Sequence, residues 1–550
     1  MKHSNRLMTP SRRSVLIQGL AIGAGAFAGC AMSVTPRISH KNPNEAPIAG
    51  TRSGKVKGFI DNDIYGFKGI PYGGDTSKRR FMAPVPPNPW TGVRETLAFG
   101  PRAPQRALAR PTTAQAADTI YPVSEDCLYL NVWTPGLRDS AKRPVMVYIH
   151  GGGYSALSAN SNVYDGVRLC RRGDVVVVTL NHRLNAFGYL YLAELGGPEF
   201  ADSGNVGQLD LILALQWVRD NIEEFGGDPK RVLIFGESGG GAKNACLMAM
   251  PGAMGLFQRA SSSSGETVTA SKPETATARA RQVLAALQLT PDRINEIKAV
   301  PMEQLITASS ASGYYGPVVD GKSLPRHPFH PDATPISAHI PFMVGTMHDE
   351  ARVLVGRGNP AAFDLTWETL PAMLRRYSEK MGDLDIEKDV IAMYRRLYPD
   401  ATASDVLFRA TTDSRDWRPA LVEIERRAAL PKGSAPTYSY QVDWWSPVDN
   451  GKWRAHHALD IPFLFDNVTY SNNSTGTSTD AYWMAEQISE TYISFARSGN
   501  PNNPRIPHWP AYDLKDRATM CFDKASRVVN DPRSEERKLF SRIPYENPGT

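Results

Sequence analysis

Residues 232–240 read VLIFGESGG, and residues 242–250 continue as AKNACLMAM. The first four residues are apolar and predict a buried strand, while the second segment has the composition of a helix. The small residues between them predict a sharp turn with Ser238 at its apex, and glycine suits such a turn because a side chain at 236 or 240 would collide with neighbouring elements. The same pattern also occurs in plain turns of glycine-rich chains, so the surrounding sequence has to decide whether Ser238 is reactive.

A second glycine-rich segment favours a reactive serine. Residues 145–149 read VMVYI and predict a strand, and the loop that follows, residues 150–154, reads HGGGY. A loop without side chains lets backbone N–H groups approach a carbonyl oxygen and stabilise negative charge that develops on it. We predict Gly152, Gly153 and Gly239 as the donors, the last at the positive end of a helix dipole. The alternative, a phosphate-binding loop, lacks the Gly-Lys-Ser/Thr sequence that such loops carry.

The rest of the chain predicts a mostly parallel sheet. Short apolar runs alternate with helical patterns, as expected for strands that are buried on both faces. Between two of these runs, residues 209–225 place apolar side chains at helical spacing, which predicts a strand, helix, strand unit. One domain spanning residues 49–540, with long surface insertions, is the simplest account of the chain. The predicted strands are residues 145–149, 175–180, 232–235, 342–345 and 438–442.

The composition is that of an ordinary soluble globular protein, with 550 residues of which 41% are hydrophobic and 21% charged. The formal net charge is +6, and residues 1–30 contribute four of these charges and no acid. The remainder gives no reason to expect a nucleic-acid partner. The five cysteines form no Cys-x-x-Cys and no His/Cys pair at metal-ligand spacing, so no metal site is expected.

The first thirty residues predict an export signal. Residues 11–16 read SRRSVL and begin a weakly apolar run that ends at Ala28 and is too short to span a bilayer. The pattern is similar to a bacterial twin-arginine signal, which implies a periplasmic or extracellular protein. The alternative is a basic amphipathic first helix, which the glycines at 19, 23 and 25 would weaken.

Two further features flank this signal. Residues 27–30 read FAGC and resemble a lipoprotein cleavage box, so Cys30 is a candidate for an N-terminal lipid anchor. Residues 31–48 are rich in Pro, Ser and Asn and predict a flexible spacer. No other stretch reaches about 18 consecutive apolar residues, so no membrane span is expected in the mature chain.

Several long segments match the signatures of known proteins. Residues 225–240 read FGGDPKRVLIFGESGG, and residues 125–132 read EDCLYLNV. Both resemble signatures of the type B carboxylesterase family. The resemblance implies an α/β-hydrolase fold, with a large, mostly parallel central sheet flanked by helices, and a serine hydrolase that acts on small-molecule carboxylic esters. Similar segments in the same order cover almost the whole mature chain and include residues 67–72, 181–188, 316–321 and 495–501.

The same resemblance supplies two catalytic partners for Ser238. Residues 345–350, GTMHDE, are similar to the family's acid segment, whose last carboxylate orients the histidine, and this makes Glu350 the acid. Residues 457–465, HALDIPFLF, are similar to the histidine segment, and this makes His457 the base. Asp349 and His456 are the adjacent alternatives. The chain order Ser, Glu, His is that of α/β-hydrolases.

The predicted roles follow from the acidity of the groups. A serine hydroxyl does not ionise at neutral pH, so His457 has to accept its proton while Oγ attacks the ester carbonyl. Glu350 fixes the tautomer of the histidine and stabilises the imidazolium. The alcohol leaves with that proton, and water activated by the same histidine then releases the acid from the acyl-enzyme, with no cofactor involved.

Two matching pairs are expected to be structural rather than catalytic. By the resemblance, Arg80 pairs with Glu125 and Arg183 with Asp210 in internal salt bridges. The loss of either pair should impair folding before chemistry, because an orphaned buried charge is expensive.

The chain also departs from the family. Ala103 stands where relatives carry the disulfide partner of the signature cysteine, so Cys127 is expected to be a free, buried thiol. Gly239 replaces the more usual alanine beside the nucleophile. No tryptophan occurs between Trp90 and Cys127, where cholinesterases carry the aromatic ring that stacks on choline, so cholinesterase activity is not expected.

Two other functions compete with ester hydrolysis. Some members of the superfamily have lost catalytic residues and serve as noncatalytic binding proteins, whereas all the predicted catalytic positions are present here. The same acyl-enzyme route also cleaves amides, thioesters, carbamates and polyesters. The sequence alone does not separate these substrates, because acyl and alcohol preferences depend on loop geometry.

Overall fold

A computed structural model describes residues 40–107 and 120–549, apart from residues 43, 44, 378, 380 and 548 and the side chains of 471–473. The predicted export signal, Cys30 and the first part of the predicted spacer lie outside these residues. The chain divides into two compact units, Met1–Arg37 and Ile38–Thr550, and all elements described below belong to the second unit.

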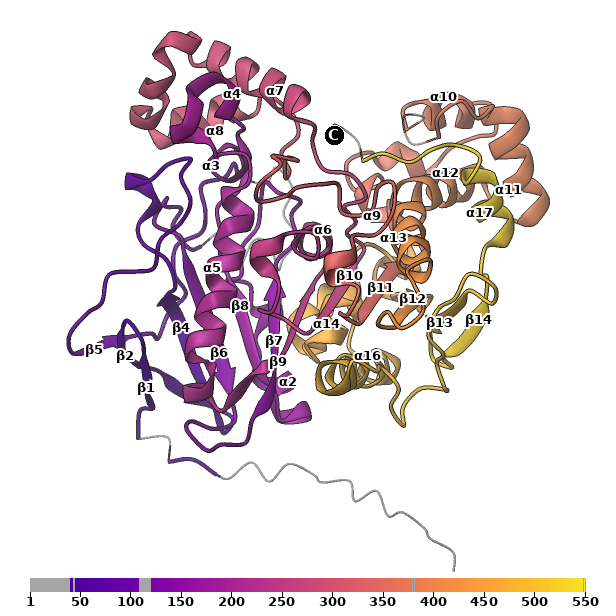
Figure 1. The fold of residues 1–550 in the computed structure, drawn as a ribbon. Coiled ribbons are helices and arrows are strands. Elements are labelled where there is room, and N and C mark those ends of the chain that lie inside the picture. Colours follow the sequence, from indigo (N-terminus) through magenta and orange to yellow (C-terminus); the bar gives the residue numbers. More distant parts are fainter. Residues whose placement is uncertain are drawn as a thin grey trace, which may run out of the picture. The chain divides into compact units, whose positions relative to one another are not determined.

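An eleven-stranded sheet forms the centre of the described chain (Figure 1). Seven neighbouring strands are parallel, and antiparallel strands continue the sheet at both edges, which confirms the expected large, mostly parallel sheet. The parallel strands, in spatial order, are β8 (Val176–Leu180), β7 (Arg143–Ile149), β9 (Gly227–Gly236), β10 (Arg259–Ser263), β11 (Phe342–Met347), β12 (Thr437–Val442) and β13 (Ala518–Phe522). The antiparallel strands are β6 (Tyr129–Thr134), β4 (Ile64–Pro71) and β3 (Phe59–Asp61) beside β8, and β14 (Arg527–Asn530) beside β13.

A small second sheet lies near the start of the described chain. It consists of β1 (Ile48–Thr51), β2 (Gly54–Lys57) and β5 (Val93–Glu95). The residues just before it contact the body, because the backbone N–H of Lys41 donates to Asp63 Oδ1 at 3.0 Å and Lys41 Nζ donates to Pro135 O at 2.7 Å. This end of the predicted spacer is therefore packed against the main sheet's strands and loops.

The central sheet is buried on both faces, and the alternation along β7 shows how. Val145, Val147 and Ile149 belong to one hydrophobic cluster, whereas Met146 and Tyr148 belong to another on the opposite face. The first cluster packs against α5 (Val206–Asn221), α6 (Gly239–Leu247) and α13 (Arg418–Ala428). The second packs against α2 (Val167–Gly173), α14 (Ile461–Leu464) and α16 (Thr479–Ser498). Strands with two buried faces read as continuous apolar runs, which is why all five predicted strands are confirmed.

The two predicted helices differ from the observed ones at their ends. The helix expected over 209–225 begins at Val206 and ends at Asn221, after which Ile222–Phe225 forms a 3₁₀ turn that Gly226 closes at a φ of +70°. The helix expected over 242–250 is α6, which begins at Gly239, directly after Ser238, and ends at Leu247. Helix propensity does not predict a helix that begins in the glycines at 239–241, because glycine is a poor helix former.

Two groups of helices outside the sheet layers have hydrophobic clusters of their own (Figure 1). One is formed by α3 (Asn185–Tyr189), α7 (Pro273–Ala286) and α8 (Met302–Ser309). The other contains α10 (Leu370–Arg375), α11 (Ala392–Leu397), α12 (Ala403–Thr412) and α17 (Ser534–Phe540), with π-helical segments η10 (Ile386–Ile391) and η11 (Asp413–Trp417). The remaining short helices are α4 (Ala193–Gly196), α9 (Ala351–Leu354), α15 (Asn472–Thr475) and 3₁₀ turns at Thr76–Lys78, Asn162–Tyr164, Gly197–Phe200, Pro251–Ala253, Pro291–Ala299, Pro335–Ser337, Pro360–Phe363, Val448–Gly451 and Val468–Ser471.

Both predicted salt bridges are present. Arg183 and Asp210 are 2% and 0% exposed, and two hydrogen bonds join them, from Nη2 to Oδ1 at 2.6 Å and from Nε to Oδ2 at 2.9 Å. Arg80 Nε donates to Glu125 Oε2 at 2.6 Å. Each pair joins segments that are far apart in the sequence, so both belong to the framework of the fold.

The cysteines of the described residues, Cys127, Cys170, Cys246 and Cys521, are all free and buried, as expected for Cys127. Burial raises the pKa of each thiol. Among the helices of the described chain, none combines the length and the apolar character needed to cross a bilayer.

Candidate active site

Ser238 occupies the sharp turn between β9 and α6. Its backbone has a φ of +56° and a ψ of −128°, a conformation that side chains rarely adopt and that must be held by the surrounding structure. The backbone N–H of Ser238 donates to Ser263 O on the neighbouring strand at 2.8 Å. A Cβ atom at Gly240 would lie 1.9 Å from Ile149 O, so only glycine permits this approach of α6 to β7.

The glycine-rich loop predicted to hold an oxyanion lies directly against this turn. A Cβ atom at Gly239 would lie 2.1 Å from Gly153 O and 2.5 Å from Gly153 N, so the loop occupies the space that an alanine methyl would need. Within the described part of the chain, the N–H groups of Gly152, Gly153 and Gly239 form no hydrogen bond. Three predicted donors are therefore available to a ligand.

Glu350 and His457 are brought into direct contact. His457 Nδ1 lies 2.6 Å from Glu350 Oε2. The other oxygen of Glu350 accepts hydrogen bonds from the backbone N–H of Met347 at 2.7 Å and from Ser264 Oγ at 2.5 Å. Glu350 is fully buried at the end of β11, so its carboxylate is fixed by three partners, of which one is the imidazole.

The adjacent alternatives have other partners. Asp349 Oδ2 lies 3.0 Å from His348 Nδ1, and its other oxygen faces Arg352 and Arg454 at 3.6 and 3.8 Å. Burial would raise the pKa of Asp349, but the interactions with His348, Arg352 and Arg454 outweigh it and lower that pKa to about 2. The ring of His456 faces the carbonyl oxygen of its neighbour His457 at 2.8 Å, and burial lowers its pKa.

Glu237, the residue before the predicted nucleophile, lies on the other side of the histidine. Its Oε1 lies 3.2 Å from His457 Nε2. Among the described residues, neither Ser238 Oγ nor Glu237 Oε1 forms a hydrogen bond, so Nε2 is bonded to neither of them. Burial raises the pKa of Glu237, and although burial opposes the imidazolium, Glu237 and Glu350 raise the pKa of His457.

Asp460 is a third buried carboxylate near His457. Its Oδ2 accepts a hydrogen bond from Ser263 Oγ at 2.5 Å, and burial raises its pKa to about 6. Sequence reasoning missed Glu237, Asp460 and Ser264 as members of this site. Glu237 and Asp460 lie within the quoted serine and histidine segments, but the residue types alone do not show that their side chains converge on one imidazole.

Two cavities meet at these residues. The larger has a volume of about 500 Å³ and a mostly apolar wall, and the smaller has a volume of about 270 Å³. Both are bordered by Gly153, Ser238, Leu354, Arg415 and His457. The larger is further lined by Gly152, Leu157, Ser158, Ser161, Val163, Tyr164, Glu237, Val353, Arg357, Trp453, His456, Ala458, Ile461, Pro462 and Ser474. A nucleophile and a histidine between two cavities suit a substrate whose two halves are separated by the bond to be cleaved.

Comparison with known proteins identifies the family of the chain. A sequence profile described as "Carboxylesterase family" matches residues 45–540. The chain belongs to the carboxylesterase family. The para-nitrobenzyl esterase of Bacillus subtilis is 36% identical over 90% of this chain and 98% of its own length, and the phenmedipham hydrolase of Pseudarthrobacter oxydans is 30% identical over 88% and 97%. A crystal structure of a carboxylesterase from Geobacillus stearothermophilus matches with a TM-score of 0.78 at 35% identity, over 90% of this chain and 99% of that one.

Membership of the family has direct consequences for function. The protein is a carboxylic-ester hydrolase with the α/β-hydrolase fold, and its relatives are named as esterases. The resemblance stated from the sequence is thereby confirmed.

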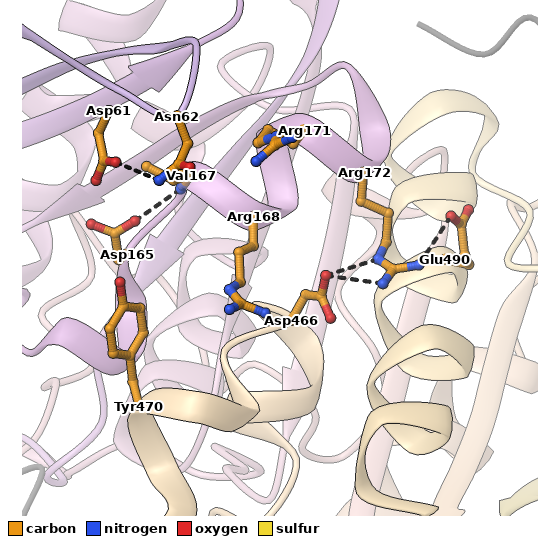
Figure 2. A pocket seen from close by; sticks show the side chains of 10 residues that line it. All are labelled: Asp61, Asn62, Asp165, Val167, Arg168, Arg171, Arg172, Asp466, Tyr470 and Glu490. Carbon is orange, nitrogen blue, oxygen red and sulfur yellow. Dashed lines mark hydrogen bonds and ion pairs between the residues drawn. The ribbon is translucent and has the colours of Figure 1, made fainter. Parts of the chain in front are cut away.

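Another cavity of this carboxylesterase lies away from Ser238 and has a different character. Its volume is about 640 Å³, and Figure 2 shows Arg168, Arg171 and Arg172 of α2 facing it together with four carboxylates. Arg172 Nη2 is paired with Asp466 Oδ2 at 2.9 Å. Among the described residues that line this cavity there is no serine, cysteine or histidine. It therefore lacks the serine and histidine that border the two cavities at Ser238.

Proposed function

We propose that this carboxylesterase cleaves small-molecule esters through an acyl-enzyme in which Ser238 is the nucleophile, His457 the base and Glu350 the acid that orients the histidine. The observation that carries the proposal is the 2.6 Å contact between His457 Nδ1 and Glu350 Oε2 at the wall of the cavity that Ser238 borders. An imidazole held in this way has a fixed tautomer, with Nε2 left to exchange a proton.

Stabilisation of the tetrahedral intermediate is assigned to backbone groups. The N–H groups of Gly152, Gly153 and Gly239 have no partners among the described residues and lie beside the nucleophile. Each well-placed donor of this kind contributes about 3 kcal/mol to the stability of an oxyanion. Ester cleavage by this route requires no cofactor.

The resting position of the histidine adds a step to the proposed cycle. Nε2 lies 3.2 Å from Glu237 Oε1 without a hydrogen bond to it, so the hydrogen bond between Nε2 and Ser238 Oγ has to form when substrate binds. Catalytic hydrogen bonds often tighten only in the substrate complex. His457 then accepts the serine proton, passes it to the leaving alcohol, and activates the water that hydrolyses the acyl-enzyme.

The first experiment compares wild type with Ser238→Ala on the p-nitrophenyl esters of acetate, butyrate and octanoate. We expect turnover by the wild type, a loss of roughly 10⁴-fold or more in the variant, and covalent labelling of the wild type alone by a serine-directed phosphonate. Equal activity of the two proteins would refute the assignment of Ser238. A wild type that is inert and unlabelled would instead support the noncatalytic binding role.

The same acyl-enzyme route is chemically open to amides, thioesters, carbamates and polyesters. Matched p-nitrophenyl esters and p-nitroanilides of one acid test this range, because the two differ only in the leaving atom. We expect much faster turnover of the ester, since an amide nitrogen is the poorer leaving group and needs protonation as it departs.

We also propose that the protein is exported by a twin-arginine signal in residues 1–30 and that it works in the periplasm or outside the cell. The pair Arg12-Arg13 before an apolar run supports this proposal. Replacing both arginines by lysine should leave the protein in the cytoplasm, as measured by fractionation and immunoblotting. Unchanged export would refute the signal, and labelling with a radioactive fatty acid in wild type but not in Cys30→Ser would establish the lipid anchor.

A further inference from the structure

The wall of the catalytic cavities carries an arginine that the proposed catalytic cycle does not use. Arg415 borders both the larger and the smaller cavity, as do Ser238 and His457. Its side chain is 36% exposed, and within the described chain its one ion pair joins Nε to Asp416 Oδ1 at 3.6 Å. That distance is longer than a hydrogen bond, so the donors of the guanidinium remain available toward the cavity.

The backbone around Arg415 is irregular and firmly held. Residues Asp413–Trp417 form a π-helical segment inserted between α12 and α13. Segments of this kind are rare and occur frequently at functional sites. Asp413 is buried, accepts a hydrogen bond from Tyr394 Oη at 2.5 Å, and forms an ion pair with Arg533. The guanidinium of Arg533 also lies over the ring of Trp417.

Within this π-helical segment, one side chain borders the cavities. Ser414 Oγ donates to Ala410 O at 2.7 Å, and Asp413, Ser414, Asp416 and Trp417 are all buried. Arg415 is the only partly exposed residue of the segment. The insertion therefore presents a positive charge to the space beside the nucleophile.

The charges of the two cavities differ in sign. In the larger cavity, Arg357 joins Arg415, and the only carboxylate among the described lining residues is Glu237, which faces His457. The smaller cavity instead holds Glu266 and Asp416 beside Arg415. An anionic group would be attracted by the larger cavity and repelled by the carboxylates of the smaller one.

We infer that the preferred substrates are esters that carry a free carboxylate on the half that enters the larger cavity, where Arg415 binds it. A planar guanidinium matches a carboxylate with two parallel hydrogen bonds, which gives both affinity and orientation. This inference rests on the proposed function, because it concerns the substrate of the same Ser238 site.

Two matched pairs of esters test the inference, one for each half of the substrate. The 4-nitrophenyl monoester of glutaric acid is compared with 4-nitrophenyl pentanoate, which has the same number of acyl carbons and no charge. 4-Acetoxybenzoic acid is compared with its methyl ester, which places the charge on the alcohol half. The measured quantity is the ratio of kcat/KM for the acidic ester to kcat/KM for the neutral ester.

We expect this ratio to exceed one for the wild type in one of the pairs and to fall about tenfold in Arg415→Gln, because a hydrogen-bonded charge pair is lost. High salt should lower the ratio in the wild type, since solvent-accessible charges are screened. Arg281→Gln is the matched control: Arg281 is exposed on α7 and borders neither cavity, so the ratio should not change.

A second measurement does not depend on the folding of a variant. Glutarate should inhibit wild-type hydrolysis of the neutral ester competitively and about tenfold more strongly than uncharged glutaramide. The inference is overturned if the neutral esters are hydrolysed but the ratios of kcat/KM are the same in Arg415→Gln as in the wild type. It is also overturned if glutarate and glutaramide inhibit equally. Either result leaves the proposed function standing. If the wild type hydrolyses none of the four esters, both fall.

Discussion

Three buried carboxylates surround a single imidazole in this enzyme. Glu350 holds Nδ1 of His457, Glu237 faces Nε2, and Asp460 lies behind them in contact with Ser263. Burial raises the pKa of Glu237 and of Asp460, while Glu237 and Glu350 raise the pKa of His457. The proton that the proposed base has to release is therefore held in part by the negative charge of Glu237.

The pH dependence of Glu237→Gln follows from this arrangement. Removing a negative charge beside Nε2 destabilises the imidazolium and lowers the pKa of His457, so the neutral base exists at lower pH. The acidic limb of the kcat/KM profile should move down by about one pH unit or more. Glu223→Gln, at an exposed position on the turn after α5, serves as the control and should leave the limb in place. A shift to higher pH in Glu237→Gln would contradict this electrostatic account.

Lys243 carries an ammonium group that burial makes unfavourable. It is fully buried in α6, Nζ donates to His150 O at 3.0 Å, and it forms no ion pair among the described residues. Burial lowers its pKa to about 7, so the folded protein binds fewer protons than the unfolded chain between about pH 7 and the usual lysine range. The charge therefore destabilises the fold most at pH 7 and below, and this penalty decreases as the pH rises toward 10.5.

Lys243→Met should accordingly stabilise the protein. We expect an increase of about 2 kcal/mol or more in the free energy of unfolding at pH 6 and a smaller increase at pH 9, measured by urea denaturation. The carbonyl that Lys243 holds begins the glycine loop, so kcat should fall in the same variant. A gain in stability that grows with pH would contradict the assignment of the penalty to a buried ammonium.

At the scale of elements, the contact between the turn at Ser238 and the glycine loop sets the positions of the predicted oxyanion donors. The loop fits only because residue 239 has no side chain, since a Cβ atom there would meet Gly153 O at 2.1 Å. The positions of the predicted oxyanion donors are therefore coupled to one missing methyl group.

Gly239→Ala should displace the loop and lower kcat by about tenfold or more, because even one misplaced oxyanion donor costs that much. The measurement is kcat on p-nitrophenyl butyrate together with the melting temperature. Gly252→Ala is the control, since its Cβ atom would only touch Ile212 at an ordinary 3.5 Å. Unchanged kcat in Gly239→Ala would mean that the glycine loop accommodates the methyl group without displacing its N–H groups.

At the scale of the whole molecule, buried ion pairs connect elements that the sheet does not. Arg183, after β8, binds Asp210 on α5 and also donates to Met82 O at 2.9 Å. Asp210→Ala should destabilise the protein by about 3–5 kcal/mol in urea unfolding, because it leaves Arg183 charged and buried. The exposed pair Arg293–Glu296 is the control, and Glu296→Ala should cost no more than about 1 kcal/mol. Recovery of stability in Arg183→Met/Asp210→Leu would show that the unpaired charge, rather than the lost bridge, is the cause.

The central architecture could be predicted from the sequence because its signals are local. The run Val145–Ile149 predicts a strand with two buried faces, and the Gly-x-Ser-x-Gly turn needs its small residues wherever it occurs. Glu350 and His457 could be named only by resemblance, since their contact joins residues 107 positions apart. The approach of Glu237 to His457 and the π-helical insertion at Arg415 depend on tertiary packing, so neither local propensity nor spacing reveals them.

The rates at which the four buried cysteines react would report local opening of the enzyme. A thiol that is enclosed and hard to ionise reacts with a disulfide reagent only while the surrounding structure is transiently open. Cys246 sits in α6, the helix that carries the predicted nucleophile at its start, whereas Cys521 sits in β13 near the edge of the sheet. Their separate modification rates, followed by mass spectrometry, would measure how often α6 and the sheet edge open transiently, without any probe having been engineered into the chain.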